Sequence, residues 1–361
     1  MKAAVLREVG KPLTIEDVEI DKPKGHEVLI RTAAVGVCHS DLHFIDGLYP
    51  YPLPTVPGHE SAGIVEAVGP EVRTVKKGDR VITCLSAYCG HCAHCLTGRM
   101  SLCVSSETRR GRDEPARISG AAGGMMQFLN LSSFAEQILT HEHACVAIHE
   151  EIEMDRAAVI GCAVMTGVGA VIHTAAVRPG ETVAVIGCGG IGLSAINGAA
   201  IAGAGRIIAI DRVPEKLELA KKFGATDVID ASDADPVQAV LDLTKGGVDH
   251  AFEAIGLKVT AEQSFQMTAR GGCATVIGMI PYGTKIEITG SDLLGERRLQ
   301  GSMMGSNHFP VDMPRLVDFY RRGLLKLDEL IAQRVKLEDI NGAIDELRSG
   351  KLARSVVMFD H

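Results

Sequence analysis

The chain has 361 residues, of which 46% are apolar and 23% are charged. This balance excludes an extensively disordered protein, and the length is enough for about two domains. Asp and Glu number 45 against 37 Lys and Arg, so the net charge is −8 without any basic run, which argues against a nucleic-acid partner.

The first 150 residues have the pattern of a β domain. Apolar and alternating segments such as 27–37, 62–68 and 81–83 are short and are separated by Gly and Pro. Four prolines between positions 50 and 57 predict a rigid loop without regular structure. The first residues lack the long apolar stretch of a signal peptide, so we expect a soluble, cytoplasmic protein.

From about residue 155 the pattern changes to alternating strands and helices. Buried strands are predicted at 182–186, 207–210, 227–229, 250–253 and 273–277, with helices at 214–223 and 236–244. Repeated β-α-β units of this kind form a doubly wound parallel sheet. After about residue 305 a mixed pattern returns, with helices expected at 314–322 and 340–349.

One stretch, residues 183–205, carries no charge over 23 residues and is long enough to span a membrane. Seven of these residues are glycine, which favours a strand, a glycine turn and a buried helix. We therefore expect no membrane partner.

Four of the ten cysteines occur within 15 residues, with the spacing Cys89-x2-Cys92-x2-Cys95-x7-Cys103. Four thiolates on one short loop can close a tetrahedral shell around zinc with no position left for water, which is typical of a structural site. The alternative is a set of reduced, buried thiols, but the loop is hydrophilic. His91 and His94 lie between the cysteines and are expected at the surface.

A glycine pattern, Gly187-x-Gly189-x-x-Gly192, follows the predicted strand 182–186 and opens a helix. In a β-α-β unit such a loop lets the backbone approach a pyrophosphate at a helix N-terminus. Asp211 ends the next strand 19 residues after Gly192, where a carboxylate accepts from a ribose hydroxyl and repels a 2′-phosphate. This favours NAD over NADP, although the neighbouring Arg212 offsets part of the repulsion.

Three further segments carry dispersed metal-ligand chemistry. They are Cys38-His39-Ser40-Asp41-Leu42-His43, Gly58-His59-Glu60 and Gly161-Cys162. Each one alone is unremarkable, because a single Cys is usually a core residue and a single His is usually solvated. Together they offer two thiolates and one imidazole, the set expected for a catalytic zinc with an open fourth position.

At this point the sequence resembles the zinc-dependent medium-chain alcohol dehydrogenase family, nearly end to end. The segment Gly58-His59-Glu60-x2-Gly63-x5-Gly69-x2-Val72 matches the zinc signature of that family, and the other motifs follow in the family order. The resemblance implies that Cys38, His59 and Cys162 bind the catalytic zinc. It also implies that Glu60 is a carboxylate near the metal and that Asp41 orients the His59 ring.

The resemblance also implies the fold. A mostly β, partly open (GroES-like) catalytic domain is expected at 1–163, with a structural zinc lobe at about 86–104. A Rossmann domain with a doubly wound parallel sheet is expected at 164–305, and the catalytic domain resumes at 306–361. Two zinc ions per chain and NAD are the implied cofactors.

Proton transfer from Ser40 through the nicotinamide ribose to His43, and then to solvent, is implied in the same way. The coenzyme-binding residues implied are His39, Thr166, Gly187, Gly189, Gly190, Ile191, Gly192, Asp211, Arg212, Lys216 and Arg354. Many members carry Arg at the position of His39, so we expect looser contact with the pyrophosphate here. Apolar substrate walls are implied at Leu85, Phe128, Leu129 and Met279. A charged loop before them, with Arg109, Arg110 and Arg117, is expected to be a solvated face.

These observations predict a zinc-dependent, NAD-linked dehydrogenase that interconverts an apolar primary or secondary alcohol and its aldehyde or ketone. The alternatives are a glutathione-dependent formaldehyde dehydrogenase or a nicotinoprotein of the same family that keeps NAD bound. A more remote alternative is an inert structural or binding relative with the same fold. We expect a homo-oligomer, with a dimer favoured over a tetramer.

Overall fold

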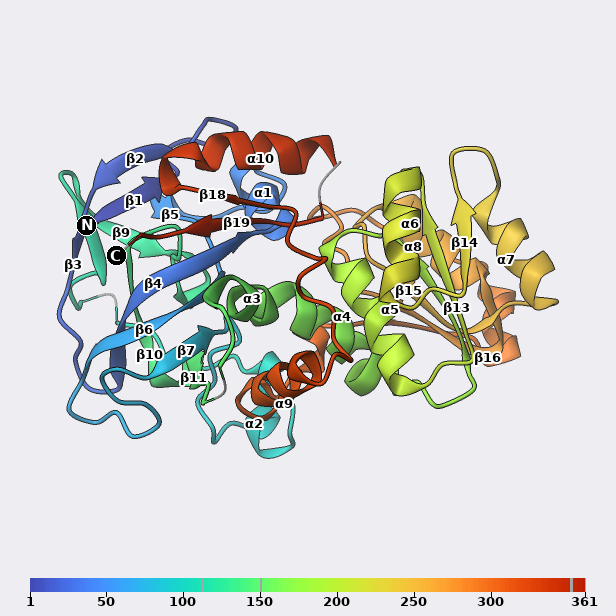
Figure 1. Cartoon of the computed structure of the whole chain (residues 1–361), viewed down its shortest axis with the longest axis horizontal. Coiled ribbons are helices and arrows are strands. Elements are labelled where there is room, and N and C mark those ends of the chain that lie inside the picture. The colour runs from blue at the N-terminus through green and yellow to red at the C-terminus, as the bar shows by residue number, and fades with distance from the viewer. Residues whose placement is uncertain (112, 150, 351–352, 361) are drawn as a thin grey trace. The chain divides into compact units, whose positions relative to one another are not determined.

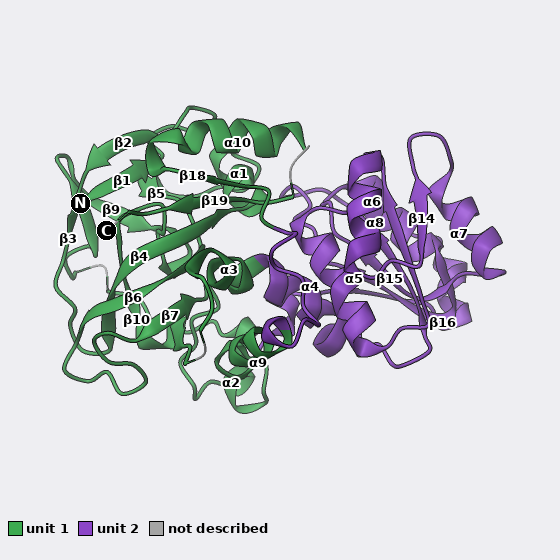
Figure 2. Ribbon diagram, in the orientation of Figure 1, with its two compact units in different colours: residues 1–162, 308–319, 331–361 green, residues 163–307, 320–330 purple. Residues whose placement is uncertain are grey.

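The computed structural model describes residues 1–111, 113–149, 151–350 and 353–360 (Figure 1). The chain forms two compact units, shown in Figure 2. Unit 1 comprises residues 1–162, 308–319 and 331–361, and unit 2 comprises residues 163–307 and 320–330. The fold class predicted from the sequence, a doubly wound parallel sheet inserted in a mostly β domain, is confirmed.

Unit 1 is built on a seven-stranded sheet in the order β11-β7-β6-β4-β19-β18, with β10 also paired to β4. The bounds of its strands are β4 Glu27–Val37, β6 Glu60–Val68, β7 Arg80–Thr83, β10 Gln137–His141, β11 Cys145–Ala147, β18 Gln333–Val335 and β19 Ser355–Met358. The central strand β4 is long enough to pair with three others, β6, β10 and β19.

Smaller sheets and helices complete the part of unit 1 that the structure describes. A four-stranded sheet contains β3 (Glu19–Ile20), β8 (Ile118–Gly120), β9 (Gly123–Gln127) and β5 (Thr55–Val56), and β1 (Lys2–Val5) pairs with β2 (Thr14–Asp17). The helices are α1 (His39–Ile45), α2 (Ala93–Leu96), α3 (Met154–Val159), α9 (Phe309–Arg321) and α10 (Ile340–Ser349). The last two residues of α9 belong to the 320–330 segment of unit 2. Strand β5 corrects our expectation that the proline-rich segment 50–57 has no regular structure.

Unit 2 contains a six-stranded sheet in the order β14-β13-β12-β15-β16-β17, with every neighbouring pair parallel. Its strands are β12 Thr182–Ile186, β13 Arg206–Asp211, β14 Asp227–Asp230, β15 Val248–Glu253, β16 Thr268–Val276 and β17 Arg298–Gly301. Its helices are α4 Met165–Gly169, α5 Gly190–Ala202, α6 Pro214–Phe223, α7 Pro236–Thr244 and α8 Lys258–Gln266. The strand order reverses at β12, the place where dinucleotides bind in sheets of this type.

The uncharged stretch 183–205 forms most of β12, the glycine turn and α5, as the glycine pattern predicted. Among the described residues, one helical run, Met154–Thr174, is long and apolar enough for a membrane span. Its most apolar window is 83% buried inside the structure, which is how the core helix of a globular protein looks.

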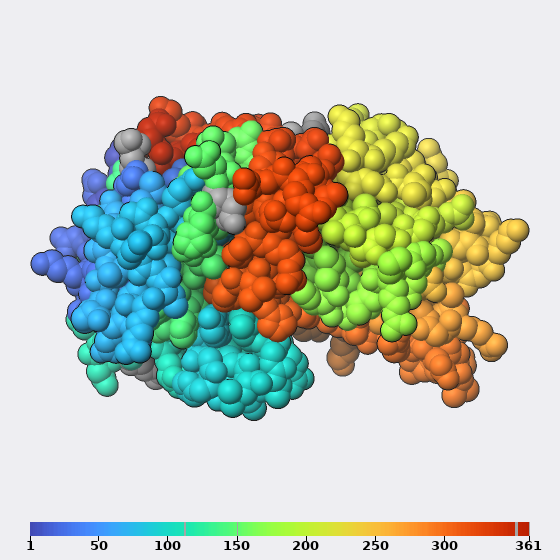
Figure 3. Space-filling model, turned by 60° about the horizontal axis from the view of Figure 1, so that its bottom comes forward, coloured from blue at the N-terminus to red at the C-terminus, as the bar shows by residue number. Residues whose placement is uncertain are grey.

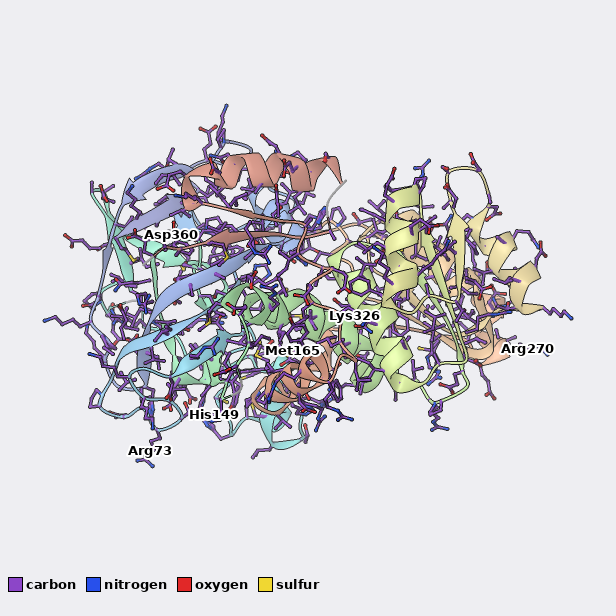
Figure 4. The ribbon with its side chains drawn as sticks, in the orientation of Figure 1. Arg73, His149, Met165, Arg270, Lys326 and Asp360 are labelled. Carbon is purple, nitrogen blue, oxygen red and sulfur yellow. The ribbon has the colours of Figure 1, made fainter. Side chains whose placement is uncertain are left out.

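Residues 320–330 correct the domain boundary that we expected. We placed all of 306–361 in the catalytic domain, but this short segment belongs to unit 2. The side chain of Asn197 on α5 holds it there, because its amide donates to the Leu324 carbonyl (3.1 Å) and accepts from the Lys326 amide (2.8 Å; Lys326 is labelled in Figure 4).

Helix α9 begins five residues before the predicted start at Pro314. The backbone amide of His308 donates to the Asp312 carboxylate at 2.7 Å, and the His308 carbonyl accepts from the Val311 and Asp312 amides. These bonds stabilise the first turn, and Pro310 fits there because the first helical positions need no amide donor. Pro314 is therefore inside the helix, and its position alone was a misleading start signal.

Three histidines meet at the end of β10 in unit 1. The ring of His141 is 4.9 Å from that of His143 and 5.5 Å from that of His26, measured between centroids. Its Nδ1 accepts a hydrogen bond from the His143 amide (3.0 Å), which requires that nitrogen to be unprotonated. Burial lowers the pKa of His141 to about 4, with His143, His26 and Arg117 adding to the effect and Glu142 opposing it.

The stability of the protein is expected to fall as the pH drops from about 6.5 towards 4, because the unfolded chain protonates His141 first. The free energy of unfolding, measured in urea, should fall between about pH 7 and pH 5, and this fall should be smaller by about 1 kcal/mol in His141→Gln than in the wild type. The difference is only of this size because solvent screens the half-buried ring. The exposed His149 is the control, and His149→Gln should behave like the wild type. Equal pH dependence in His141→Gln and the wild type would contradict this assignment.

Candidate metal and coenzyme sites

A buried set of two thiols and one imidazole lies at the ends of two neighbouring strands in unit 1. The antiparallel register of β4 and β6 pairs Gly36 with Glu60, so the residues just beyond, Cys38 and His59, come together. Cys162 joins them from the helical run that starts at α3, and its Sγ is 3.2 Å from His59 Nε2. The three ligand atoms lie within 4.8 Å of one another, and all three side chains are buried.

Asp41, in the first turn of α1, holds His59 and the backbone next to it by hydrogen bonds. One of its carboxylate oxygens accepts from His59 Nδ1 (2.8 Å) and from the Gly58 amide (3.1 Å), and the other accepts from the Cys38 amide (3.2 Å). Because Nδ1 is occupied, His59 presents Nε2 to the sulfurs. Burial opposes protonation of His59, but the Asp41 carboxylate and the Cys38 sulfur together outweigh it and raise the pKa of His59 well above its ordinary value.

The chemistry of this donor set fits a catalytic zinc. Three protein ligands of sulfur, sulfur and nitrogen leave a fourth tetrahedral position open. A hydrogen bond from Cys162 lowers the pKa of the Cys38 thiol well below its ordinary value, so one thiolate is already favoured. The structure therefore brings together the three ligands that the resemblance implied.

Glu60 and Arg354 form a buried charged pair beside the thiols. Arg354 Nη1 is 3.5 Å from a Glu60 carboxylate oxygen and donates to the Val37 carbonyl (3.0 Å). Neither carboxylate oxygen of Glu60 has a hydrogen-bond partner among the described residues, and burial raises the pKa of Glu60 to about 8. A Cβ at Gly36 would approach this carboxylate to 2.7 Å, so glycine makes the room for it.

The predicted proton-transfer residues are both on α1. Ser40 Oγ is 3.7 Å from Cys38 Sγ, and His43 is one turn further along. The half-buried His43 ring stacks on Tyr49 with centroids 6.2 Å apart, and burial lowers the pKa of His43. His39, at the start of the same helix, is exposed.

Of the predicted substrate walls, three are in unit 1 and one, Met279, is in unit 2. Phe128 is fully buried, and its ring stands edge-on to the His59 imidazole with centroids 6.3 Å apart. Leu129 follows it. The side-chain Nδ2 of the next residue, Asn130, donates to the Leu85 carbonyl (3.1 Å).

Two aromatic residues that the sequence did not predict as part of the site pack against Phe128. Phe44 on α1 and Tyr51 in the proline-rich segment pack edge-on against Phe128, at 5.0 and 5.1 Å between centroids. The aromatic spacing Phe44, Tyr49, Tyr51 directly after the Cys38 segment was the available signal.

The four cysteines of the predicted lobe converge in unit 1, where the lobe forms a cyan projection of the surface (Figure 3). Their Sγ–Sγ distances include 3.5 Å for Cys92–Cys95, 3.7 Å for Cys89–Cys103 and 3.9 Å for Cys92–Cys103. The amides of Cys92 and Cys89 donate to the sulfurs of Cys89 and Cys103, which stabilises thiolates. Four sulfurs within 4.8 Å of one another fit a structural zinc.

The two histidines of the lobe do not complete this set. His91 is exposed and pairs with Glu107 at 3.1 Å, as the sequence suggested. His94 is half-buried on α2, which corrects the expectation that it lies fully at the surface.

In unit 2 the glycine loop joins β12 to α5 with the geometry that the pattern predicted. Gly187 has φ +96°, and a Cβ at Gly192 would approach the Gly187 carbonyl oxygen to 1.7 Å, so both positions require glycine. Gly189 caps α5, and Gly190 and Ile191 form its first turn, a position where free backbone amides can bind an anion.

Asp211 ends β13 beside this loop. Its carboxylate accepts from the Cys188 amide (2.7 Å) and from the Arg212 amide (2.8 Å), so it braces the loop as well as presenting a negative charge. Arg212 is exposed, and Lys216 lies in the first turn of α6. Thr166 is buried on α4, with its hydroxyl 3.5 Å from Met304 Sδ.

Comparisons with known proteins identify the family of the chain. The alcohol dehydrogenase GroES-like domain matches residues 24–150, and the zinc-binding dehydrogenase family matches residues 190–322. An S-(hydroxymethyl)glutathione dehydrogenase of Synechocystis sp. is 39% identical over 99% of both chains. An alcohol dehydrogenase class-3 of Myxine glutinosa is 37% identical over 99% of this chain and 97% of its own.

A solved structure has the same fold. The benzyl alcohol dehydrogenase from Acinetobacter calcoaceticus superposes with a TM-score of 0.94 at 33% identity, over 99% of each chain. The chain therefore belongs to the zinc-dependent medium-chain alcohol dehydrogenase family, whose cofactors are zinc and NAD or NADP.

Proposed function

We propose that this dehydrogenase oxidises S-(hydroxymethyl)glutathione, the adduct of formaldehyde and glutathione, with NAD as the hydride acceptor. The observation that carries the proposal is the buried Cys38, His59 and Cys162 set with its open fourth position. The substrate is supported by relatives of that name, which are similar to this chain over nearly its whole length.

The chain's own residues have separate roles in this reaction. Cys38, His59 and Cys162 would hold a zinc ion, which would supply the Lewis acidity that lowers the pKa of a substrate hydroxyl. Asp41 keeps the His59 ring oriented, and Ser40, next to Cys38, is placed to accept the proton of the substrate hydroxyl. His43 passes that proton on. Because burial lowers its pKa, the ring stays neutral, and can accept a proton, at pH values below the ordinary pKa of histidine.

A second candidate is an apolar or aromatic primary alcohol, the substrate class that the sequence analysis favoured. It is supported by Phe128, whose ring stands edge-on to His59, and by Phe44 and Tyr51, which pack against Phe128. A benzyl alcohol dehydrogenase among the similar structures is consistent with it. A homodimer remains a prediction from the family resemblance.

A substrate series followed by the absorbance of reduced nicotinamide tests both candidates. Turnover with formaldehyde and glutathione together, but not with either alone, is the expected result. Faster turnover of benzyl alcohol favours the second candidate, and the absence of turnover with every alcohol contradicts both. Acid release of NAD from the purified protein identifies a nicotinoprotein, which then needs a second substrate for recycling.

The preference for NAD is expected to depend on Asp211. Replacing it with Ala removes the acceptor for a ribose hydroxyl and the repulsion of a 2′-phosphate, so kcat/KM for NAD should fall by about tenfold. The ratio of kcat/KM for NADP over NAD should rise. Asp230, which ends β14, is the matched control, and Asp230→Ala should leave the ratio unchanged. An unchanged ratio in Asp211→Ala would refute this role.

A further inference from the structure

The segment that follows β9 has a strained backbone. Leu129, Asn130 and Ser132 have φ of 46°, 65° and 59°, in the left-handed region that residues with a Cβ rarely adopt. Each costs about 1–2 kcal/mol. Three such residues within four positions persist only where the surroundings hold them, and strain of this kind concentrates at functional sites.

The hydroxyl of Tyr51 holds the beginning of this segment from both sides of Phe128. It donates to the Gln127 carbonyl at 2.8 Å and accepts from the Leu129 amide at 3.2 Å. The Phe128 amide donates to Ser132 Oγ at 2.7 Å. One side-chain hydroxyl therefore fixes the two peptide groups that set the direction of the Phe128 and Leu129 side chains.

A buried ion network holds the same segment through Gln127. Its side-chain Oε1 accepts from Arg117 (2.7 Å), and its side-chain Nε2 donates to the Leu139 carbonyl (2.7 Å). Arg117 and Arg110 both bind the Glu27 carboxylate, and all three side chains are more than nine-tenths buried. The loop that we expected to be a solvated face is thus anchored in the interior at these two arginines. Buried charges are tolerated because each one is paired and hydrogen-bonded.

Asn130 links the segment to another predicted wall residue. Its side-chain Nδ2 donates to the Leu85 carbonyl (3.1 Å), and its side-chain Oδ1 accepts from Arg109 (2.9 Å). Its backbone carbonyl accepts from the Thr140 hydroxyl (2.8 Å). Leu85, Phe128 and Leu129 are consequently fixed by one set of hydrogen bonds. Phe128 in turn stands against the zinc ligand His59.

We propose that Tyr51 is a positioning residue that determines alcohol specificity, by holding the strained segment 127–132 and with it the wall formed by Phe128 and Leu129. This inference rests on the proposed function, since the wall matters only if an alcohol binds beside His59. A rigid wall selects substrates by fit, so loosening it weakens the binding of the preferred alcohol. It leaves the chemistry of a small alcohol nearly unchanged.

Tyr51→Phe tests the proposal, because it removes the hydroxyl and keeps the ring that packs on Phe44 and Phe128. The KM of the preferred alcohol should rise about tenfold, from the loss of two hydrogen bonds, while kcat stays within about twofold. The KM of ethanol should change little, so the enzyme discriminates less. Tyr88→Phe is the matched control, since Tyr88 is another half-buried tyrosine of unit 1, stacked on His143. It should retain the wild-type ratio of KM values.

Hydrogen exchange gives a second readout that does not need turnover. The peptide that covers 127–132 should exchange about tenfold faster in Tyr51→Phe than in the wild type or Tyr88→Phe, because the Leu129 amide loses its acceptor. An unchanged exchange rate overturns the inference that Tyr51 holds the segment. Faster exchange with an unchanged ratio of KM values, or an equal loss of kcat for every alcohol, overturns its role in specificity. A wild-type protein inactive on all alcohols overturns the proposed function, while the exchange measurement still decides whether Tyr51 holds the segment.

Discussion

His59→Ala is expected to abolish alcohol oxidation, with a fall in turnover of at least about a thousandfold. The substitution removes the only nitrogen ligand from the set of Cys38, His59 and Cys162, and it leaves the Asp41 carboxylate without the imidazole that it orients. Elemental analysis should find one zinc per chain in place of two. Binding of NAD should largely survive, because the glycine loop belongs to unit 2.

The control for this experiment is His91→Ala, which removes an exposed histidine from the other metal site without removing a ligand. It should keep two zinc ions and wild-type turnover. Substantial activity in His59→Ala, or two zinc ions still bound, would refute the catalytic metal site. Loss of NAD binding together with activity would indicate a general folding defect instead.

Cys103→Ser is expected to empty the four-cysteine lobe and to destabilise the protein. Serine replaces one of four soft thiolates whose sulfurs lie within 4.8 Å of one another, and structural zinc sites contribute their binding energy directly to folding. The midpoint of thermal unfolding should fall by about 10 °C or more. The zinc content should fall to one ion per chain, which is retained by the catalytic set.

Cys273→Ala separates loss of metal from loss of a buried thiol. Cys273 lies in β16 of unit 2, is buried and belongs to neither cluster, so its removal should lower stability only modestly and leave both zinc ions in place. The structural role of the lobe is excluded if Cys103→Ser binds two ions and unfolds at the wild-type temperature. Cys103→Ser should remain active at temperatures well below its unfolding temperature, since none of the catalytic ligands is in the lobe.

Most of the regular structure could be predicted where a short segment carries its own start and stop signals. Helix α7 follows the prediction because Asp235 caps it by accepting from the Val237 amide, and Pro236 occupies its first position. The glycine loop was equally readable, since Gly187 and Gly192 are required by local backbone geometry. The start of helix α9 could not be predicted in this way. Pro314 lies inside the helix, which begins at Phe309 because of hydrogen bonds made by His308 and Asp312.

The same distinction applies to the sites. The four-cysteine lobe could be read from the sequence because its ligands lie within 15 residues, so that spacing alone restricts their geometry. Spacing does not restrict the catalytic set in this way. The family resemblance named its ligands, whereas the pairing of Gly36 with Glu60 explains why Cys38 and His59 meet.

The sequence by itself therefore predicted the fold class, the coenzyme loop and the four-cysteine lobe, and the family resemblance supplied the candidate ligands of the catalytic set. Only the tertiary structure revealed that Arg110 and Arg117 are buried and that Tyr51 holds a segment 76 residues away in the chain. The physical reason is that caps, turns and loop spacings depend on neighbours in sequence. Buried ion pairs and long-range hydrogen bonds exist only after distant segments have packed together.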